Sequence, residues 1–291
     1  MRFGPILPNS GAPSRADMLA VVRAAEELGY DSLWTPAHTA IPAHFVSRYP
    51  YSPDGRPHWD AKVEWGDAFL SLTFAAALTE HVRLGPSLIP LITTDPLTLA
   101  KQAATLDVYS NGRAELGIGA GWLVEEAQAL GRPTDHRLER LEETIEILRL
   151  AFSQETFAFD GRFYKFPEVG VNPRPIQRER LPIWIGGQGQ RAVDIAARHQ
   201  CGLMLWWAEP ATVRDYIARV REAGGRGQVA AAFRLATDPA RWFDVCAEFA
   251  EAGLDLVIVT TYGGGSRLTE KLEAFAAEVV PKLGQGAPSL N

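Results

Sequence analysis

The feature that most constrains this sequence is a regular alternation of short apolar runs with longer amphipathic stretches. Eight apolar runs occur in the 291 residues, and each is followed by a stretch with helical periodicity. Continuous apolar runs are typical of parallel strands that helices cover on both faces. Eight successive strand–helix units favour a closed barrel over an open doubly wound sheet. We therefore predict an α/β protein whose residues 1–291 form a single (β/α)8 TIM barrel domain.

The predicted strands are brief apolar segments bounded by glycine, proline or polar residues. They cover residues 3–7, 31–35, 82–89, 114–118, 183–185, 203–206, 229–235 and 254–259. The predicted helices cover residues 14–28, 67–79, 96–109, 125–130, 137–152, 190–198, 211–222, 241–251 and 268–283. Pro86 and Pro90 each lack a backbone donor, which predicts a bulge or distortion near the third strand.

Two inserts interrupt the alternation. Residues 40–64 follow the second strand, are polar and have no clear period. A loop of this length is expected to form a lid or a substrate wall, or else a disordered surface excursion. Residues 156–180 precede the fifth strand and carry alternating aromatic residues around Asp160 and Gly161, a pattern that predicts a β-hairpin.

Charge and composition exclude several classes of protein. A net charge of -6 at pH 7 does not suit a general polyanion binder, so we expect no nucleic-acid partner. Uncharged apolar runs are too short to span a membrane, and the first residues lack the apolar core of a signal peptide, so we expect no membrane partner. Two cysteines, Cys201 and Cys246, fit a reducing compartment, and a cytoplasmic location is predicted.

In barrels of this kind the active site lies at the carboxyl ends of the strands. The residues predicted there are rich in glycine, aromatic and hydroxyl groups but poor in carboxylates and imidazoles, so no metal site is expected. The sequence also lacks the G-x-S-x-G elbow that holds a nucleophilic serine in many hydrolases. The predicted set is Pro8, Asn9, Thr35, Pro36, His38, residues 87–90, 119–122 and 186–190, Trp206, Trp207, Thr237 and residues 260–262.

A glycine-rich turn follows the fifth predicted strand and opens a helix. It contains Gly186, Gly187, Gln188 and Gly189, with Arg191 close behind. Glycines at a helix N-terminus let backbone N–H groups converge on an anion, which the helix dipole also favours. The turn therefore predicts a phosphate site, although an ordinary strand-to-helix turn has the same composition.

A second small-residue segment, Gly119, Ala120 and Gly121, ends the fourth strand. It does not match the dinucleotide fingerprint, which needs G-x-x-G after the first G-x-G. Its small side chains would let a planar ring lie against the backbone. The same residues would equally suit a tight turn.

His38 is the only imidazole predicted at a strand end, where it is a candidate proton donor. Its alternative role is that of a structural hydrogen-bonding group. His44 and His58 lie in the first insert and could also reach the site. Trp206 and Trp207 could line a pocket, but neighbouring strand residues face opposite sides, so at least one indole is expected in the core.

Taken together, these segments resemble the bacterial luciferase-like monooxygenase superfamily, and most of all its branch of coenzyme F-420-dependent oxidoreductases common in actinobacteria. The resemblance covers roughly residues 1–202, and the rest of the chain fits in layout more than in motif. The matching segments are residues 24–34 (AAEELGYDSLW), 50–55 (PYSPDG), 83–85 (RLG), 100–107 (AKQAATLD), 116–126 (LGIGAGWLVEE), 161–164 (GRFY) and 182–187 (PIWIGG).

The resemblance implies a barrel with an insertion region, usually a homodimer, that binds coenzyme F-420 across the strand ends. The cofactor phosphate would meet the turn from Gly186 to Gly189. The deazaflavin ring would pack on a bulge in the third strand, where the family's non-proline cis peptide maps to Ser87 and Leu88. The family commonly has Asp-His after the second strand, whereas this chain has Ala37 and His38.

The implied reaction is hydride transfer between reduced F-420 and a small organic substrate. One alternative is an FMN-dependent monooxygenase of the same fold that uses O2. Another alternative is a flavin-binding protein of the same fold without turnover. The polar and aromatic groups expected beyond the phosphate turn favour an enzyme over a binding protein.

Overall fold

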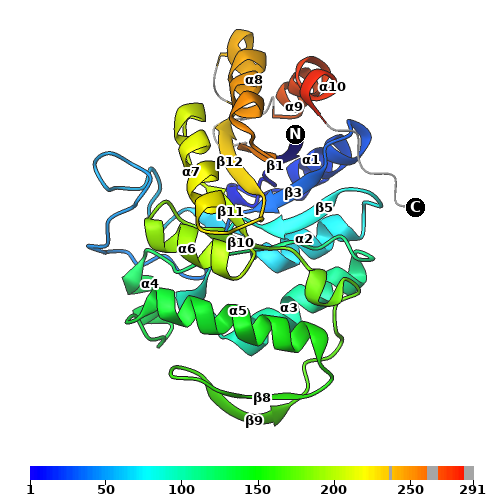
Figure 1. Cartoon of the computed structure of the whole chain (residues 1–291). Coiled ribbons are helices and arrows are strands. Elements are labelled where there is room, and N and C mark those ends of the chain that lie inside the picture. The colour runs from blue at the N-terminus through cyan, green and yellow to red at the C-terminus, as the bar shows by residue number, and fades with distance from the viewer. Residues whose placement is uncertain (236–237, 261–267, 285–291) are drawn as a thin grey trace.

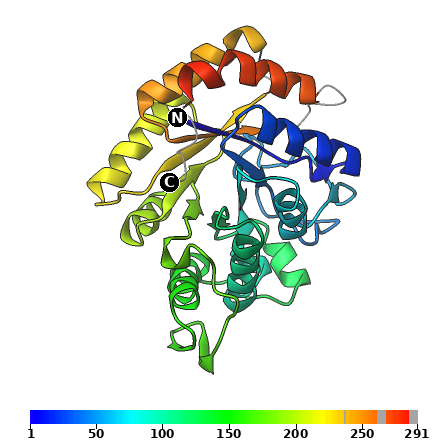
Figure 2. The ribbon, with the colours of Figure 1, turned by 90° about the vertical axis from the view of Figure 1, so that its right-hand side faces the viewer.

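The computed structural model describes residues 1–235, 238–260 and 268–284. Within them, parallel strands form a closed ring and helices lie on its outside (Figures 1 and 2). The barrel strands are β1 (Arg2–Pro5), β3 (Ser32–Thr35), β5 (Arg83–Pro86), β7 (Leu116–Gly119), β10 (Ile183–Gly186), β11 (Gly202–Leu205), β12 (Val229–Arg234) and β13 (Leu256–Thr260). The predicted strand-end residues Thr237, Thr261 and Tyr262 lie outside the described residues.

Strand pairing closes the ring. A continuous parallel sheet runs in the order β1, β13, β12, β11, β10 and β7, and β3 pairs with β5. Isolated parallel bridges join Ile6 to Trp34 and Leu84 to Ala114, which connects the two sheets at both seams. The predicted (β/α)8 barrel is confirmed.

The helices also follow the predicted pattern. They are α1 (Arg15–Glu27), α2 (Ala68–Ala76), α3 (Pro96–Tyr109), α4 (Val124–Ala129), α5 (Arg137–Ser153), α6 (Gln190–Arg198), α7 (Pro210–Glu222), α8 (Trp242–Ala252), α9 (Leu268–Glu278) and α10 (Val280–Leu283), with short 3-10 turns at Leu91–Thr93, Arg178–Arg180 and Pro239–Arg241. The single helix predicted over 268–283 is wrong in one respect, because it breaks at Val279. Pro281 has no N–H for a helical hydrogen bond, so a new helix starts there.

The third barrel strand is distorted as its prolines predict. β5 ends at Pro86, a cis peptide bond joins Ser87 to Leu88, and a two-residue strand β6 (Ile89–Pro90) resumes pairing with β7. The distortion turns the chain toward the centre of the ring at its carboxyl end.

Both inserts take definite positions. Residues 40–63 have no regular secondary structure, and the chain then enters β4 (Glu64–Trp65), which pairs antiparallel with β2 (Ser10–Gly11). The predicted hairpin is confirmed as β8 (Phe157–Asp160) and β9 (Lys165–Val169). It packs beneath α5, on the side of the molecule away from α8 (Figure 1).

The barrel has two apolar layers. The outer layer fills the space between strands and helices, with buried residues such as Leu33, Leu116 and Phe275. The inner layer is a separate cluster inside the ring, formed by Ile6, Trp34, Trp184, Met204, Trp206, Ala230, Ala232, Leu256 and Ile258. The middle of the ring is therefore filled by side chains.

A buried charge network closes the amino-terminal end of the barrel. Glu115 is 2% exposed and accepts hydrogen bonds from Arg2 Nη1 at 3.0 Å and from Trp184 Nε1 at 2.6 Å. Arg83 Nε donates to the same carboxylate. Burial raises the pKa of Glu115, but the two guanidinium groups outweigh it and hold this pKa below its usual value.

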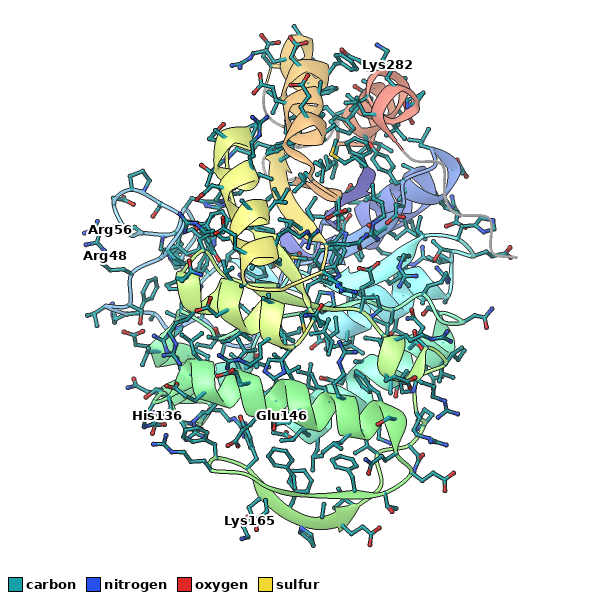
Figure 3. The ribbon with its side chains drawn as sticks, viewed as in Figure 1. Arg48, Arg56, His136, Glu146, Lys165 and Lys282 are labelled. Carbon is teal, nitrogen blue, oxygen red and sulfur yellow. The ribbon has the colours of Figure 1, made fainter. Side chains whose placement is uncertain are left out.

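We expect Glu115→Gln to lower the free energy of unfolding by about 3 kcal/mol at neutral pH, because it leaves two guanidinium groups without their buried counter-ion. A lowered folded-state pKa stabilises the protein above the unfolded-state value of about 4.3 and loses that contribution as the pH falls. Urea unfolding should therefore show the difference between the two proteins shrinking below about pH 4. Asp160→Asn, which breaks the exposed pair with Lys165 at the hairpin (Figure 3), is the control and should change little. Equal stability of Glu115→Gln and the parent at pH 7 would contradict the prediction.

Candidate active site

A cavity of about 1020 Å³ opens at the carboxyl ends of the strands. The first insert, the strand ends and the start of α6 all contribute residues to its lining. All of the predicted catalytic and cofactor-binding residues line this one cavity. They are His38, Ser87, Leu88, Gly119, Ala120, Gly121, Gly186, Gly187, Gln188, Gly189 and Arg191. The structure thus brings the predicted residues together, while their roles stay predictions.

Some predicted strand-end residues take other positions. Asn9 is buried outside the cavity wall and donates from Nδ2 to the carbonyl oxygens of Pro36 and Gly66, each at 3.1 Å. Thr260 is also buried, and its hydroxyl donates to the carbonyl of Phe233 at 3.0 Å. These side chains join neighbouring loops and strands.

The two tryptophans after β11 also differ from expectation. β11 ends at Leu205, and Trp207 has a left-handed backbone with φ of 59°. The strict alternation of a strand therefore does not apply, and both indoles line the cavity. Trp206 is 9% exposed and belongs to the inner barrel cluster as well, so one of the pair is in the core as predicted.

The side chain of Leu88 explains the glycine at the end of β10. A Cβ atom on Gly186 would lie 1.8 Å from Leu88 Cδ1, whereas one on Gly117 in β7 would meet the carbonyl oxygen of Pro86 at 2.2 Å before Leu88 Cδ2 at 3.0 Å. Leu88 therefore occupies the space that a side chain at the end of β10 would need. Sequence reasoning assigned Gly186 to a ligand, but this glycine also leaves room for Leu88.

Ser87, next to Leu88, contributes an unused polar group. It is 5% exposed, and its hydroxyl oxygen has no hydrogen-bond partner among the described residues. Leaving such a group unpaired costs free energy unless a ligand or water satisfies it. Ser87 lines the cavity, so this hydroxyl is available to a bound molecule.

The start of α6 presents free backbone donors. Its N-cap residue, Gly189, makes no side-chain capping hydrogen bond, and the first N–H groups of any helix lack intrahelical partners. Gln188 is held from both sides, since its Nε2 donates to Trp206 O at 2.6 Å and its carbonyl accepts from the Tyr216 hydroxyl. Arg191 is half exposed and forms an ion pair with Glu139 at 3.2 Å. This turn has the form of an anion site.

His38 is bound to a buried carboxylate that the sequence did not single out. Its Nδ1 lies 2.8 Å from Oε2 of Glu126, which is fully buried near the start of α4. The other oxygen, Oε1, accepts the backbone N–H groups of Thr39 at 2.6 Å and Ala40 at 3.0 Å. Glu126 stands in the matching segment 116–126, but only its distance in space from His38 reveals the pairing.

The pairing bears on which ring nitrogen carries the hydrogen. An ionised carboxylate only accepts hydrogen bonds, so the contact with Glu126 favours the tautomer in which Nδ1 of His38 is the donor. Nε2 is then the ring nitrogen left for chemistry in the cavity. Where the family commonly has Asp-His, this chain has Ala37 and His38. The carboxylate partner of His38 is instead Glu126, which comes from another part of the fold.

The first insert is attached to α4 through the neighbouring glutamate. Glu125 Oε1 accepts the backbone N–H groups of Val46 at 2.7 Å and Ser47 at 3.1 Å, and Ser47 Oγ accepts the N–H of Val124 at 3.1 Å. His58 lines the cavity, whereas His44 is not among its lining residues. Whether the insert opens and closes as a lid stays a prediction.

Among the residues that the structure describes, no group of three or more His, Cys, Asp or Glu side chains is arranged to hold a metal ion. None of the helices there is long and apolar enough to cross a membrane. The homodimeric state, the cytoplasmic location and the single domain stay predictions.

Comparison with known proteins identifies the family. The family described as "Luciferase-like monooxygenase" matches residues 1–249. The chain belongs to the luciferase-like monooxygenase family. It is 30% identical over 270 residues to the uncharacterized protein Rv0953c of Mycobacterium tuberculosis, covering 91% of this chain and 93% of the relative. The predicted family and the prediction of an oxidoreductase enzyme are confirmed.

Two other similar proteins have named activities. The chain is 35% identical over 134 residues to an FMNH(2)-dependent dimethylsulfone monooxygenase of Pseudomonas putida, covering 44% of this chain and 37% of the relative. The fold of this chain is similar to that of an F420-dependent secondary alcohol dehydrogenase in complex with an F420-acetone adduct. The TM-score is 0.78 at 17% identity, and the match covers 97% of this chain and 98% of the dehydrogenase chain. The family resemblance therefore spans both flavin and deazaflavin enzymes.

We expect Gly186→Ala to destabilise the protein by about 1–3 kcal/mol, because the new methyl group overlaps Leu88. Gly189→Ala is the matched control, since nothing lies within 4 Å of its Cβ position. Thermal unfolding of the two variants measures the difference. A Gly186→Ala protein as stable as Gly189→Ala would show that Leu88 does not require the glycine.

Proposed function

We propose that this enzyme transfers a hydride between reduced coenzyme F-420 and a small organic substrate. One observation carries the proposal: a single cavity is lined both by an uncapped, glycine-rich helix start and by His38, which is paired with the buried Glu126. The first feature suits the phosphate of a cofactor, and the second suits proton transfer to a substrate. The resemblance to the F-420-dependent branch supports this choice of cofactor.

The chemistry of the lining residues fits such a cofactor. Backbone N–H groups from Gln188 to Arg191 would hold the phosphate, aided by the positive end of α6. Leu88 would support the ring from below, and Ser87 would donate or accept a hydrogen bond at its edge. Gly119, Ala120 and Gly121 would leave the space beside the ring open. A deazaflavin, once bound, supplies a hydride from carbon and reacts poorly with O2.

His38 would provide the proton that accompanies the hydride. A carbonyl or imine that gains a hydride on carbon needs a proton on its heteroatom. Glu126 keeps the hydrogen on Nδ1, so Nε2 can hold this second proton when the imidazole is charged. Glu126 acts on the reaction through His38 and is a positioning residue.

Two other functions remain as candidates. An FMN-dependent monooxygenase that uses O2 is favoured by the 35% identity to the dimethylsulfone monooxygenase. A flavin-binding protein without turnover would need the same phosphate turn but not a histidine paired with a buried carboxylate. The His38–Glu126 pair therefore favours an enzyme over a binding protein.

Parallel titrations with F-420 and FMN test the choice of cofactor. We expect F-420 to bind at least tenfold more tightly, a difference of about 1.4 kcal/mol. Oxidation of reduced F-420 would then be followed by its absorbance in the presence of each member of a panel of ketones, aldehydes, imines and alkenes. Tighter binding of FMN together with O2 consumption would favour the monooxygenase. Cofactor binding without oxidation of reduced F-420 by any substrate would favour the binding protein.

Gly189→Asp tests the phosphate turn. A carboxylate at the start of α6 should weaken F-420 binding by at least about tenfold through charge repulsion. Gly189 is better suited than Gly187, where φ is 151° and a Cβ would lie 2.9 Å from that of Ala192, so that a side chain would strain the fold. Gly189→Ala is the uncharged control, and binding titration is the measurement. Unchanged affinity in folded Gly189→Asp would exclude phosphate binding at this turn.

His38→Ala is expected to lower kcat by about 100-fold while cofactor affinity is kept. His38→Gln should recover part of the loss if the imidazole only orients the substrate. Glu126→Gln should lower kcat at least about tenfold and shift its pH profile, because an amide no longer enforces the Nδ1–H tautomer. Glu125→Gln is the matched control, since Glu125 holds the insert without touching His38. A normal pH profile in Glu126→Gln would rule out the positioning role.

A further inference from the structure

The first insert contributes several aromatic rings to the cavity lining, beside Pro50, His58 and Val63. Tyr49, Tyr51 and Trp59 come from the insert itself, and their rings meet those of residues at the strand ends. The full set, which we call the aromatic wall, is Tyr49, Tyr51, Trp59, Trp65, Trp122, Trp206 and Trp207.

The rings of the aromatic wall are in contact from one end to the other. His38 lies against Trp65, with ring centroids 5.0 Å apart, and against Trp59 at 5.1 Å. Tyr49 continues the wall to Trp122 at 5.1 Å. Tyr51 then reaches Trp206 at 6.5 Å, so the wall extends from the imidazole to the tryptophans after β11.

Few formal charges face this wall. Apart from His38 and His58, the charged residues that line the cavity in the described chain are Asp17 and Arg191. Asp17 is exposed at the start of α1, where it accepts the hydroxyl of Ser14 at 2.7 Å, and Arg191 lies at the α6 turn. An anion placed against the aromatic wall would therefore lose its hydration without gaining a partner, and a cation would gain only the attraction of the ring faces.

The charges of the insert point elsewhere. Arg48 and Arg56 are exposed and project outward from the molecule (Figure 3). Arg234 stacks on Trp207 at 3.8 Å but is not among the lining residues. Burial raises the pKa of Tyr51 to about 12, so its hydroxyl stays neutral at physiological pH. Apart from His58, the surface that the insert turns toward the cavity thus carries no titratable group that is charged at physiological pH.

One polar group in the wall lacks a partner. Trp65 Nε1 is buried and has no hydrogen-bond acceptor among the described residues. An indole N–H can only donate. Because Trp65 packs against His38, an oxygen atom that accepted this hydrogen bond would also lie near the imidazole.

We propose that the aromatic wall is a substrate subsite for an uncharged molecule with an aromatic or fused-ring body and a carbonyl oxygen. The rings bind the body, Trp65 donates to the oxygen, and His38 lies beside the same oxygen. This inference deepens the proposed function and rests on it for the reaction, although binding itself can be measured without turnover.

Four naphthalene compounds of similar size test the chemistry of the subsite. They are 2-acetylnaphthalene, 2-ethylnaphthalene, 2-naphthoate and protonated 2-naphthylmethylamine, each titrated calorimetrically into the full chain, alone and saturated with F-420. We expect the neutral ketone to bind at least about tenfold more tightly than either charged compound. Tightest binding of the ammonium compound would instead indicate a cation–π site, and tightest binding of the carboxylate an anion site; either result overturns the proposal.

Variants then locate the subsite. Trp59 is a half-buried loop residue, so Trp59→Ala should fold and weaken the ketone about tenfold, while Trp59→Phe should keep most of the affinity. Trp65→Phe should weaken 2-acetylnaphthalene severalfold but leave 2-ethylnaphthalene unchanged, since only the ketone has an acceptor. Equal effects on both compounds would exclude the hydrogen bond from Trp65.

The phosphate-turn variant separates this proposal from the proposed cofactor. Gly189→Asp should weaken F-420 and leave the ketone unaffected, whereas Trp59→Ala should do the reverse. Displacement of the ketone by F-420 would place it in the cofactor half of the cavity and overturn the subsite. Retained ketone binding in a protein that binds neither F-420 nor FMN would overturn the proposed function but not the subsite.

Discussion

Every group in the candidate site depends on one constraint, the closure of eight parallel strands into a ring. In such a ring all strands end on the same rim, so residues far apart in the sequence meet there. His38 follows β3, Ser87 and Leu88 follow β5, and the turn at Gly189 follows β10. The inner apolar cluster and the Glu115 network fill the rest of the ring and its other end. Open space is thereby confined to the carboxyl rim.

Two adjacent glutamates connect the rim to the insert that covers it. Glu126 binds His38 with one carboxylate oxygen and the chain just after it with the other, while Glu125 holds the backbone farther along the insert. The position of the imidazole and the path of the insert that carries the aromatic rings therefore both depend on contacts with one short helix, α4. A change at Glu126 would affect the imidazole directly, whereas a change at Glu125 would affect the path of the insert.

Local sequence rules predicted those elements whose ends are set by local chemistry. The helix over 96–109 was predicted at its observed bounds, because Asp95 caps it and Pro96 suits its first turn. The hairpin after Phe157 followed from alternating aromatic residues and a glycine turn. Prediction failed at Val279, where a helical periodicity continued past the point at which Pro281 breaks the hydrogen-bond ladder. For the tryptophan pair the core position of Trp206 was predicted, although the strand ends before Trp207, whose backbone is left-handed.

The sequence by itself determined the barrel, the family and the segments that line the cavity, because periodicity and glycine turns act over a few residues. Only the tertiary structure decided what each residue touches. It paired His38 with a buried carboxylate 88 positions away in the sequence, and it showed that Gly186 leaves room for the side chain of Leu88. It also turned the rings of an aperiodic insert toward the strand ends. Such contacts form where barrel closure brings segments that are distant in the sequence together, and a local sequence pattern does not encode which distant segments meet.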